Sequence, residues 1–463
     1  MEITTVKNII KKYIPGHTEF IRRAEVAERY YRNKTDILFP TKAELDEKEN
    51  QTIRKADNRI PFNFHGLLVN QKAAYLFTSP PLFDLGDKQE NRKLTAFLGD
   101  QYPKVCKDLC VNASNTSIAW LHLWYEKAQK KYEYAVVPSA QIIPVWSDSL
   151  KRKLQGVLRF YRDIDSDGKE IDVYEYWNDK VCSAYKKEAD STVDDGLMAY
   201  NAYSVVDEYG GVSNKNEFEH GIGEVPFFPF FNNNIDTGDL DNIKPLIDVY
   251  CKVFSGFVND LEDIQEVILI LTNYGGADLR EFMSDLKEYK AIKIDSEEDG
   301  DKSGVSTLTI ELPVEARKEL LQIARKCIFE QGQGIDPDPQ NFGNSSGVAL
   351  SFLYSLLELK GGLQETEFKM SFGRFIRCVC RLLNIKIRDD IITQTWTRTS
   401  VKNDAEEATI ATQSKGLIAD EDIVRKHPWV EDFERSWDLL QKQRQQEDQE
   451  LSDMFPEDQA GSE

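Results

Sequence analysis

The chain has 463 residues, of which 79 are Asp or Glu and 58 are Lys or Arg, and its formal net charge is −21 at pH 7. This acidity argues against sequence-independent nucleic-acid binding as the main activity and against adsorption to an anionic membrane, because both need Lys and Arg that meet phosphates. No run of about 18 apolar residues and no amino-terminal signal sequence occurs, so a protein that is cytoplasmic or assembled from the cytoplasm, with no membrane partner, is predicted.

Seven cysteines are scattered over the chain, which is not the pattern of a disulfide framework. Cys106 and Cys110 are spaced as on one helix face, and Cys378 and Cys380 form a C-x-C pair, but no ligands at zinc spacing stand near either pair. We expect reduced thiols packed in the core, with no metal and no cofactor.

Three helices are predicted in the first quarter of the chain. Apolar residues recur near period 3.6 over 4–32, and the pattern returns over 62–78, where Pro80 and Pro81 end it. A third helix is predicted over 90–114. The polar stretch 40–58 between the first two is expected to be a surface loop.

Between 117 and 220 the period changes to two. Short aromatic and β-branched segments alternate with charged or Gly/Asp turns, which is typical of an antiparallel meander. His122 lies in one of these segments, and we expect a packed or surface imidazole because no partner is identifiable. The stretch 226–234 is expected to leave the sheet.

A long helix is predicted from Asn242 to about Thr272, because apolar residues recur in steps of three or four on one side. The other side carries Asp248, Asn259, Asp263 and Glu266. On periodicity alone, such a polar stripe is interpreted as a solvated face.

A small α/β segment is predicted after this helix. It comprises a helix over 277–289, a strand over 290–294, an acidic turn and a strand over 305–312. Pro313 then stands at the favoured first position of a helix that runs to about Gln331.

The rest of the chain is predicted to be mostly helical. One helix covers 346–360 and continues to about 384, with a kink or a break at Gly361 and Gly362. Helical segments follow to about 441, and the polar, acidic 442–463 is predicted to be disordered.

The stretch Gly343–Gly347 matches G-x-S-x-G, the pattern of a serine nucleophile on a strand-to-helix turn. Pro337 and Pro339 exclude a central strand before it, and a triad of Ser345 with Asp422 and His427 would lack a parallel sheet. No Lys or Arg lies between Lys326 and Lys360, which excludes a P-loop. The stretch is better explained as an acidic loop capped into a helix by Asn344, Ser345 or Ser346.

Five segments in order resemble the portal, or head-to-tail connector, family of tailed double-stranded DNA bacteriophages, and the siphophage type most. They are "AERYYRNKTDIL" (27–38), "NRIPFNFHGLLVNQKAAYLFTSPP" (58–81), the stretch from "HGIGEVPFFPFFNNN" to "QEVILIL" (220–271), "FGNSSGVALSFLY" (342–354) and "HPWVEDFE" (427–434). The segments 220–271 and 342–354 are the most specific of the five.

The resemblance implies a mainly helical α+β portal fold. Its parts would be a wing over 1–240 (helical 1–115, β-rich 116–220), stem helices over 241–272 and 313–333, a clip over 273–312, a tunnel loop over 334–345, a long kinked helix over 346–384 and a helical crown over 385–441.

The resemblance also implies a function without enzymatic activity. A dodecameric ring at one capsid vertex would be the channel for DNA packaging and ejection, located in the virion and assembled in the host cytoplasm. Its partners would be other copies of the chain, the terminase large subunit, the head-completion (adaptor) protein, and the major capsid and scaffolding proteins. Double-stranded DNA would pass through the channel without sequence-specific binding. A Ser345-dependent hydrolase and an acidic scaffold without a pore are the alternatives.

Site residues follow from this resemblance. Carboxylates near DNA would repel and centre the duplex over roughly 8 Å, the screening length at physiological salt. The predicted tunnel-loop positions are Asp336, Asp338, Gln340, Asn341 and Asn344, and the stem positions are Asp248, Asn259, Asp263 and Glu266. The clip surface would use Tyr274, Phe282, Asp295, Glu297, Glu298, Asp299 and Asp301, unless its acidic turn is only solvated, and the hinge glycines are Gly343, Gly347, Gly361 and Gly362.

Overall fold

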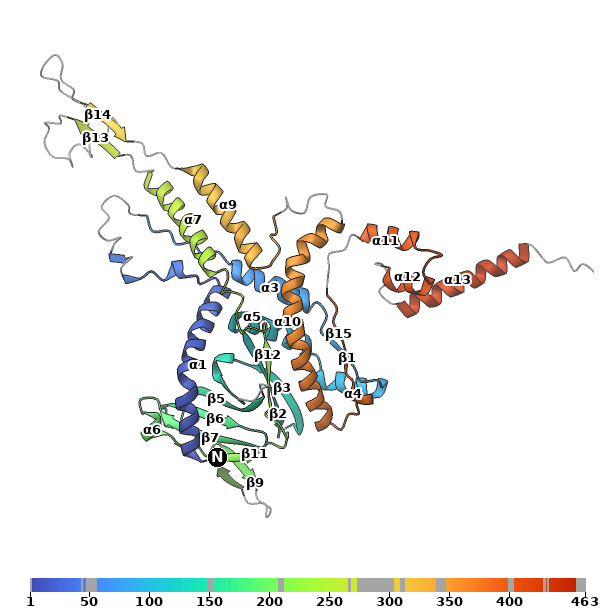
Figure 1. Cartoon of the computed structure of the whole chain (residues 1–463), viewed down its shortest axis with the longest axis horizontal. Coiled ribbons are helices and arrows are strands. Elements are labelled where there is room, and N and C mark those ends of the chain that lie inside the picture. Colours follow the sequence, from blue (N-terminus) through green and yellow to red (C-terminus); the bar gives the residue numbers. More distant parts are fainter. Residues whose placement is uncertain are drawn as a thin grey trace, which may run out of the picture. The chain divides into compact units, whose positions relative to one another are not determined.

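The computed structural model describes residues 2–42, 45–46, 56–127, 129–147, 153–165, 167–206, 212–264, 268–272, 304–308, 313–338, 347–398, 404–427, 430 and 433–454 (Figure 1). The chain divides into two units: Met1–Gly334 with Lys360–Thr397, and Ile335–Leu359 with Arg398–Glu463. Helices and antiparallel sheets share the described residues, as expected for an α+β protein.

The first two predicted helices are confirmed. Helix α1 spans Ile3–Tyr31 and buries an apolar face that includes Val6 and Ile10. Helix α3 spans Phe64–Leu76, and the Asn63 side chain caps it by accepting a hydrogen bond from the Gly66 N–H at 3.0 Å.

The single helix predicted over 90–114 is wrong, because two helices occupy this stretch. Helix α4 spans Lys88–Leu98 and α5 spans Tyr102–Thr116. Gly99 ends α4 with a φ of +62°, a conformation that favours glycine, and Pro103 lies in the first turn of α5, where no backbone donor is needed.

Two antiparallel sheets fill the centre of the first unit, which confirms the predicted meander. The smaller has the order β12-β2-β3, and the larger has the order β11-β7-β6-β5-β4 with β8 beside β7. Their bounds are β2 Ile118–Glu126, β3 Lys131–Val137, β4 Ile142–Trp146, β5 Leu154–Ile164, β6 Glu170–Trp177, β7 Val181–Glu188, β8 Met198–Ala199, β11 Glu217–Glu219 and β12 Phe227–Phe231. Two further antiparallel pairs are β9 (Tyr203–Val206) with β10 (Val212–Lys215), and β1 (Leu82–Asp84) with β15 (Thr393–Thr395).

The stretch 226–234 does not leave the sheet, contrary to the prediction. Strand β12 pairs with β2 along its length, and Pro229 is tolerated because β12 is an edge strand. The His122 ring on β2 stacks on Phe227 at 4.1 Å between ring centres, and its Nδ1 lies 2.8 Å from the Pro226 carbonyl oxygen. His122 is therefore a packed imidazole, one of the two environments expected for it.

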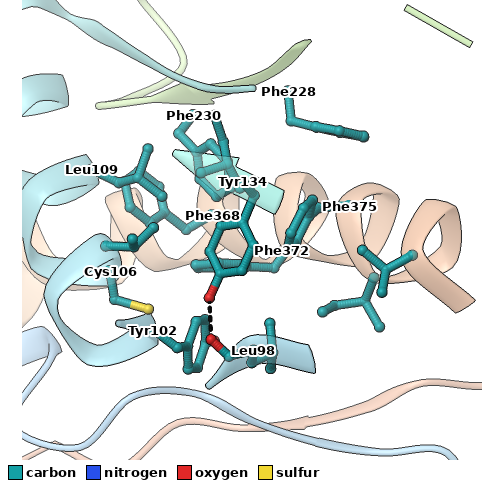
Figure 2. Packing of buried hydrophobic residues seen from close by; sticks show 14 of the residues in the cluster. Leu98, Tyr102, Cys106, Leu109, Tyr134, Phe228, Phe230, Phe368, Phe372 and Phe375 are labelled. Carbon is teal, nitrogen blue, oxygen red and sulfur yellow. Dashed lines mark hydrogen bonds between the residues drawn. The ribbon is translucent and has the colours of Figure 1, made fainter. Parts of the chain in front are cut away.

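Helix α10 (Gly347–Leu382) brings an aromatic row to the largest core (Figure 2). Phe368, Phe372 and Phe375 are fully buried against strand β12, where Phe230 lies 4.8 Å from Phe372 between ring centres. The Tyr134 hydroxyl donates to the Leu98 carbonyl oxygen at 2.5 Å, so the one polar atom of this buried ring has a partner.

Two helices and a strand pair follow β12. Helix α7 spans Lys244–Ile264 and α9 spans Val314–Gln331, while β13 (Ile268–Thr272) pairs antiparallel with β14 (Gly304–Leu308). The predicted helix to Thr272 is therefore too long: 268–272 contains two β-branched isoleucines and a threonine, which favour a strand when a partner strand is available. The predicted elements over 277–294 lie outside the described residues.

Helix α10 is continuous through Gly361 and Gly362, so a break between two helices is excluded and a kink stays a prediction. A Cβ at Gly361 would stand 3.1 Å from a methyl group of Leu76 on α3. The absence of a side chain at Gly361 thus allows α10 and α3 to approach closely.

Beyond Arg398, the described part of the second unit contains three helices. Its elements are α11 (Asp404–Gln413), α12 (Asp420–Lys426) and α13 (Phe433–Met454). The tail predicted to be disordered from 442 is helical as far as Met454, because its Gln, Glu and Lys residues are good helix formers even without an apolar stripe. The remaining short helices of the described chain are η1 (Asp36–Leu38), η2 (Ser139–Gln141), α6 (Val193–Gly196) and η4 (Arg388–Asp390).

Candidate functional site at the base of a two-helix arm

Helices α7 and α9 pack side by side and form an arm, with β13 and β14 beyond it (Figure 1). Arg317 of α9 forms an ion pair with Asp260 of α7, and its guanidinium lies 5.4 Å from the centre of the Phe257 ring. An aromatic cluster at the other end of the arm contains Phe62, Phe64 and Tyr250. The ring centre of Phe329 on α9 lies 6.0 Å from that of Phe64. The arm is therefore held by a charged pair at one end and an apolar cluster at the other.

Residues 56–60, which we call the strap, run along the polar side of α7. The backbone N–H groups of Ala56, Asn58 and Ile60 donate to the side chains of Asp263, Asn259 and Ser255 at 3.0, 2.6 and 3.0 Å. Two residues of extended chain advance about 6.6 Å and four residues of helix about 6.0 Å, so the two repeats stay in step. Polar residues four apart on α7 thus satisfy alternate donors of the strap.

Asp248 lies nearer the start of α7 and accepts hydrogen bonds from the Tyr30 hydroxyl and from Lys244 Nζ, the latter at 2.8 Å. Lys244 Nζ also contacts Asp36 at 2.5 Å. Burial, with the neighbouring Asp248 carboxylate, raises the pKa of Tyr30 well above its usual value. This group of residues joins α1 to α7.

The predicted stem residues therefore have partners within their own chain. Asp248, Asn259 and Asp263 all accept intrachain hydrogen bonds, and their position beside a channel stays a prediction. Glu266 lies outside the described residues.

Other predicted site residues are only partly described. In the predicted tunnel loop, the Asp338 N–H donates to the Asp336 carboxylate at 3.2 Å, and Gly347 is the first residue of α10. Outside the described residues lie Gln340, Asn341, Gly343, Asn344, Tyr274, Phe282, Asp295, Glu297, Glu298, Asp299 and Asp301.

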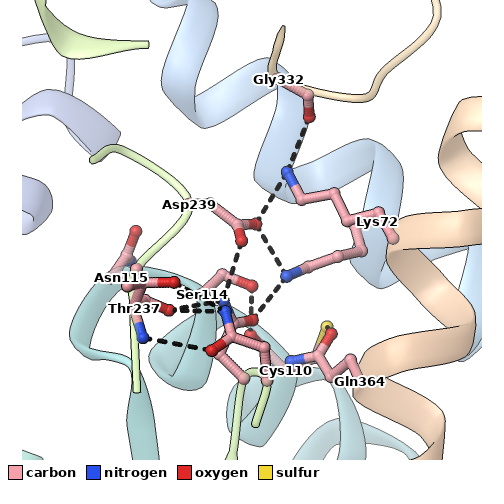
Figure 3. Close-up of polar contacts among 12 residues, drawn as sticks. Lys72, Cys110, Ser114, Asn115, Thr237, Asp239, Gly332 and Gln364 are labelled. Carbon is pink, nitrogen blue, oxygen red and sulfur yellow. Dashed lines mark hydrogen bonds and ion pairs between the residues drawn. The ribbon is translucent and has the colours of Figure 1, made fainter. Parts of the chain in front are cut away.

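A buried ion cluster at the base of the arm was missed by sequence reasoning (Figure 3). Lys72 Nζ of α3 lies 2.7 Å from Asp239 Oδ2, and Lys360 Nζ of α10 lies 3.0 Å from the same oxygen. The three side chains are 1%, 5% and 11% exposed for Lys72, Asp239 and Lys360. Asn232 accepts from Lys72 at 2.8 Å and donates to Asp239 at 2.9 Å.

The charges of the cluster depend on one another. Burial alone would raise the pKa of Asp239, but Lys360 and Lys72 outweigh burial and hold this pKa below its usual range. Burial lowers the pKa of Lys360, and Asp239 opposes that change. The one signal in the sequence was Lys72 within the apolar run of α3, but a lone lysine does not reveal its partner.

The described residues show neither a group that could hold a metal ion nor a helix long and apolar enough to cross a membrane. Cys106 and Cys110 lie in the core, where burial raises the pKa of Cys106 to about 12 and of Cys110 to about 11. These two thiols are therefore packing residues, as expected, since reactivity requires a thiolate.

The sequence matches the family model described as "Phage portal protein, SPP1 Gp6-like" over residues 10–450. The chain belongs to this family of phage portal proteins. The family suggested by the five sequence segments is thereby confirmed.

Two phage portal proteins are similar to this one over most of their length. The portal protein of Clostridium phage phiCD119 is 39% identical over 470 residues, which cover 98% of this chain and 99% of that protein. The portal protein of Bacillus phage SPP1 is 26% identical over 433 residues, which cover 90% of this chain and 83% of that protein.

Solved structures with a similar chain include the neck of an empty gene transfer agent particle, with a TM-score of 0.43, and the virion of a native gene transfer agent particle, with a TM-score of 0.39. Each match has 10% sequence identity and covers 78% of this portal protein and 88% of the other chain.

Membership of the portal family supports a structural role. Of the alternative hydrolase triad, Ser345 lies outside the described residues, while Asp422 lies on α12 and His427 at its carboxyl-terminal cap. Two members on one short helix are not the arrangement of triad residues carried on the separate loops of a sheet.

Proposed function

We propose that this portal protein assembles into a closed dodecameric ring at one capsid vertex and that DNA passes through the ring during packaging and ejection. Similarity to phage portal proteins over nearly the full chain supports this function. The structural observation that carries the ring is an exposed apolar stripe on α9.

The stripe consists of Ala316, Leu320, Ile323 and Cys327, spaced 4, 3 and 4 residues apart on one side of α9. Leu320 is 44% exposed and Ile323 is 51% exposed, while the α9 residues Ala324 and Ile328 are buried. Successive steps of three and four place the stripe on a helix face of its own, as in the seam of a coiled coil. A second copy of the chain is the partner we propose for it, since each copy in a ring contacts the next through two different surfaces.

Replacing Leu320 and Ile323 together with Glu is expected to yield folded monomers in place of rings, because carboxylates buried between two copies would lack partners. Native mass spectrometry and electron microscopy measure the change. The matched control is Gln322→Glu, which adds a carboxylate at an exposed position on another side of α9 and should leave rings intact. Rings of unchanged size from the double variant would contradict the proposed contact.

The channel is proposed to be lined by carboxylates and amides, in keeping with a net charge of −21 per copy. Replacing Asp336 and Asp338 with Lys is expected to leave the ring assembled but to impair DNA packaging, because two added cations per copy would bind phosphates and retard the duplex. Packaged DNA per particle in a reconstituted reaction is the measurement. Unchanged packaging would place these two residues away from the DNA path.

The terminase large subunit is proposed to hydrolyse ATP and to dock on the ring, so the portal itself needs no catalytic residue. The head-completion protein, the major capsid protein and the scaffolding protein are the other proposed partners. The ring is proposed to assemble in the host cytoplasm and to remain in the virion. A pull-down of purified terminase by the ring, lost when 295–301 are replaced by Gly and Ser, tests the clip surface.

A further inference from the structure

The carboxyl-terminal end of α9 is capped by a lysine from another helix. Lys360 Nζ on α10 donates to the Gly332 carbonyl oxygen at 2.8 Å, and Gly332 is the cap residue of α9. The last turn of α9 contains no basic residue of its own. Since a cation stabilises the carbonyl end of a helix, Lys360 supplies the charge that α9 lacks.

The turn after α9, residues 332–334, has a strained backbone that contacts from other residues must stabilise. The Gly334 N–H donates to the Phe329 carbonyl oxygen at 3.0 Å, which closes the turn, and Gln333 has a φ of +52°. That left-handed position is usually taken by Gly or Asn, so Gln333 adopts it at a cost in free energy. Contacts from outside the turn must therefore compensate.

Lys360 also joins the turn to the buried ion cluster. The Lys360 ammonium contacts Asp239, which also forms an ion pair with Lys72 of α3. Asp239 lies five residues before Lys244, the first residue of α7. Lys360 thus links the cap residue of α9 to the Asp239 carboxylate (Figure 3). A cavity of about 70 Å³ beside Lys360 is lined by Gln331 and Gln333 and has room for several water molecules.

Gly332 and Lys360, which the hydrogen bond joins, lie close to the points where the chain passes from one unit to the other. The chain leaves the first unit after Gly334 and returns to it at Lys360. Both partners of the hydrogen bond between Lys360 and Gly332 therefore belong to the first unit.

We propose that Lys360 is a positioning residue that joins the end of α9 to α10 and thereby holds the left-handed turn at 332–334 in place. The contact between Lys360 and Gly332 is distinct from the Lys72–Asp239 ion pair, so the two can be tested separately. This contact between Lys360 and Gly332, which we call the joint, lies within a single chain and does not depend on the ring or on the proposed channel.

Hydrogen exchange of the isolated chain tests this joint. In Lys360→Met, the amides of Gly332, Gln333 and Gly334 are expected to exchange at least tenfold faster, while those of β6 and β7 stay unchanged. In Lys360→Arg the slow exchange is expected to return, because the cavity gives the larger side chain room and the charge is kept. The matched control is Lys369→Met on the same helix, where the lysine forms an ion pair with Glu365 at 2.6 Å.

A triple variant separates positioning from stability. Replacing Lys72 and Lys360 with Met and Asp239 with Leu removes all three charges, so it is expected to unfold at a temperature close to that of the natural chain. Exchange at 332–334 should nevertheless stay fast, because α9 has lost its cap. Slow exchange in this variant, or in Lys360→Met, would overturn the proposal while leaving the portal assignment untouched.

Discussion

Asp239→Asn is expected to lower the free energy of unfolding by about 3–5 kcal/mol, because it leaves two buried ammonium groups with no carboxylate. The side chain keeps its size, so no cavity accompanies the loss of charge. Denaturant unfolding at pH 7, followed by circular dichroism, measures the difference. The change should be far larger than the typical surface substitution, since all three side chains are almost fully excluded from water.

Two further variants give this prediction its control and its rescue. Asp108→Asn breaks the exposed ion pair with Lys104 and should alter the free energy of unfolding by no more than about 1 kcal/mol. Adding Lys360→Met to Asp239→Asn should recover part of the loss, because one of the two unpaired charges is then gone. A loss below about 1 kcal/mol in Asp239→Asn would show that the cluster is hydrated and contributes little.

The second large effect is a loss of stability as the pH falls from 7 toward 4, driven by two buried histidines. Burial lowers the pKa of His65 and of His122 to about 4 in each case. Because the folded-state pKa lies below the unfolded value of about 6.5, the unfolded chain takes up protons first. The stabilising contribution is complete above pH 6.5 and disappears toward pH 4, and it amounts to about 3–3.5 kcal/mol per histidine.

The charged neighbours of each ring modify this effect without reversing it. Asp239 raises the pKa of His65, whereas Lys360 and Lys72 lower it, and Arg159 and His220 lower the pKa of His122. Two substitutions remove the titrating rings and keep a hydrogen-bond donor. In His65→Gln the new amide can donate to Asn115, which His65 Nε2 contacts at 2.8 Å. In His122→Asn the new amide can donate to the Pro226 carbonyl oxygen. The double variant should show a flatter dependence of unfolding free energy on pH between 7 and 5 and a parallel curve above pH 7. If the unfolding free energy of the double variant depended on pH as in the natural chain, the loss of stability would not come from His65 and His122.

Some features could be predicted because they follow from local periodicity. Apolar residues at period 3.6 predicted α1 and α3, and alternation at period two predicted the antiparallel strands between 117 and 220. The division at Gly99 was missed because the pattern of apolar residues continues through it. Strand β13 was missed for a similar reason, since Ile268 and Leu271 fit a helical stripe as well as a strand.

The site was harder to predict because its partners are far apart in the sequence. The polar side of α7 was recognised, but periodicity cannot tell a side chain that meets water from one that accepts the N–H of Ala56 or Asn58. The exposed stripe on α9 could not be predicted either. Periodicity predicts an amphipathic helix there, but it does not show that Leu320 and Ile323 stay uncovered by their own chain.

The sequence by itself determined the portal family, the α+β class and the acidity of the chain, because family segments, periodicity and charge are all carried by residues near one another in the chain or by simple counts. Only the tertiary structure decided that Lys72, Asp239 and Lys360 form one buried cluster and that Lys360 caps α9. The physical reason is that a buried charge is tolerated only beside its counter-charge, and 167 residues separate Lys72 from Asp239 and 121 separate Asp239 from Lys360.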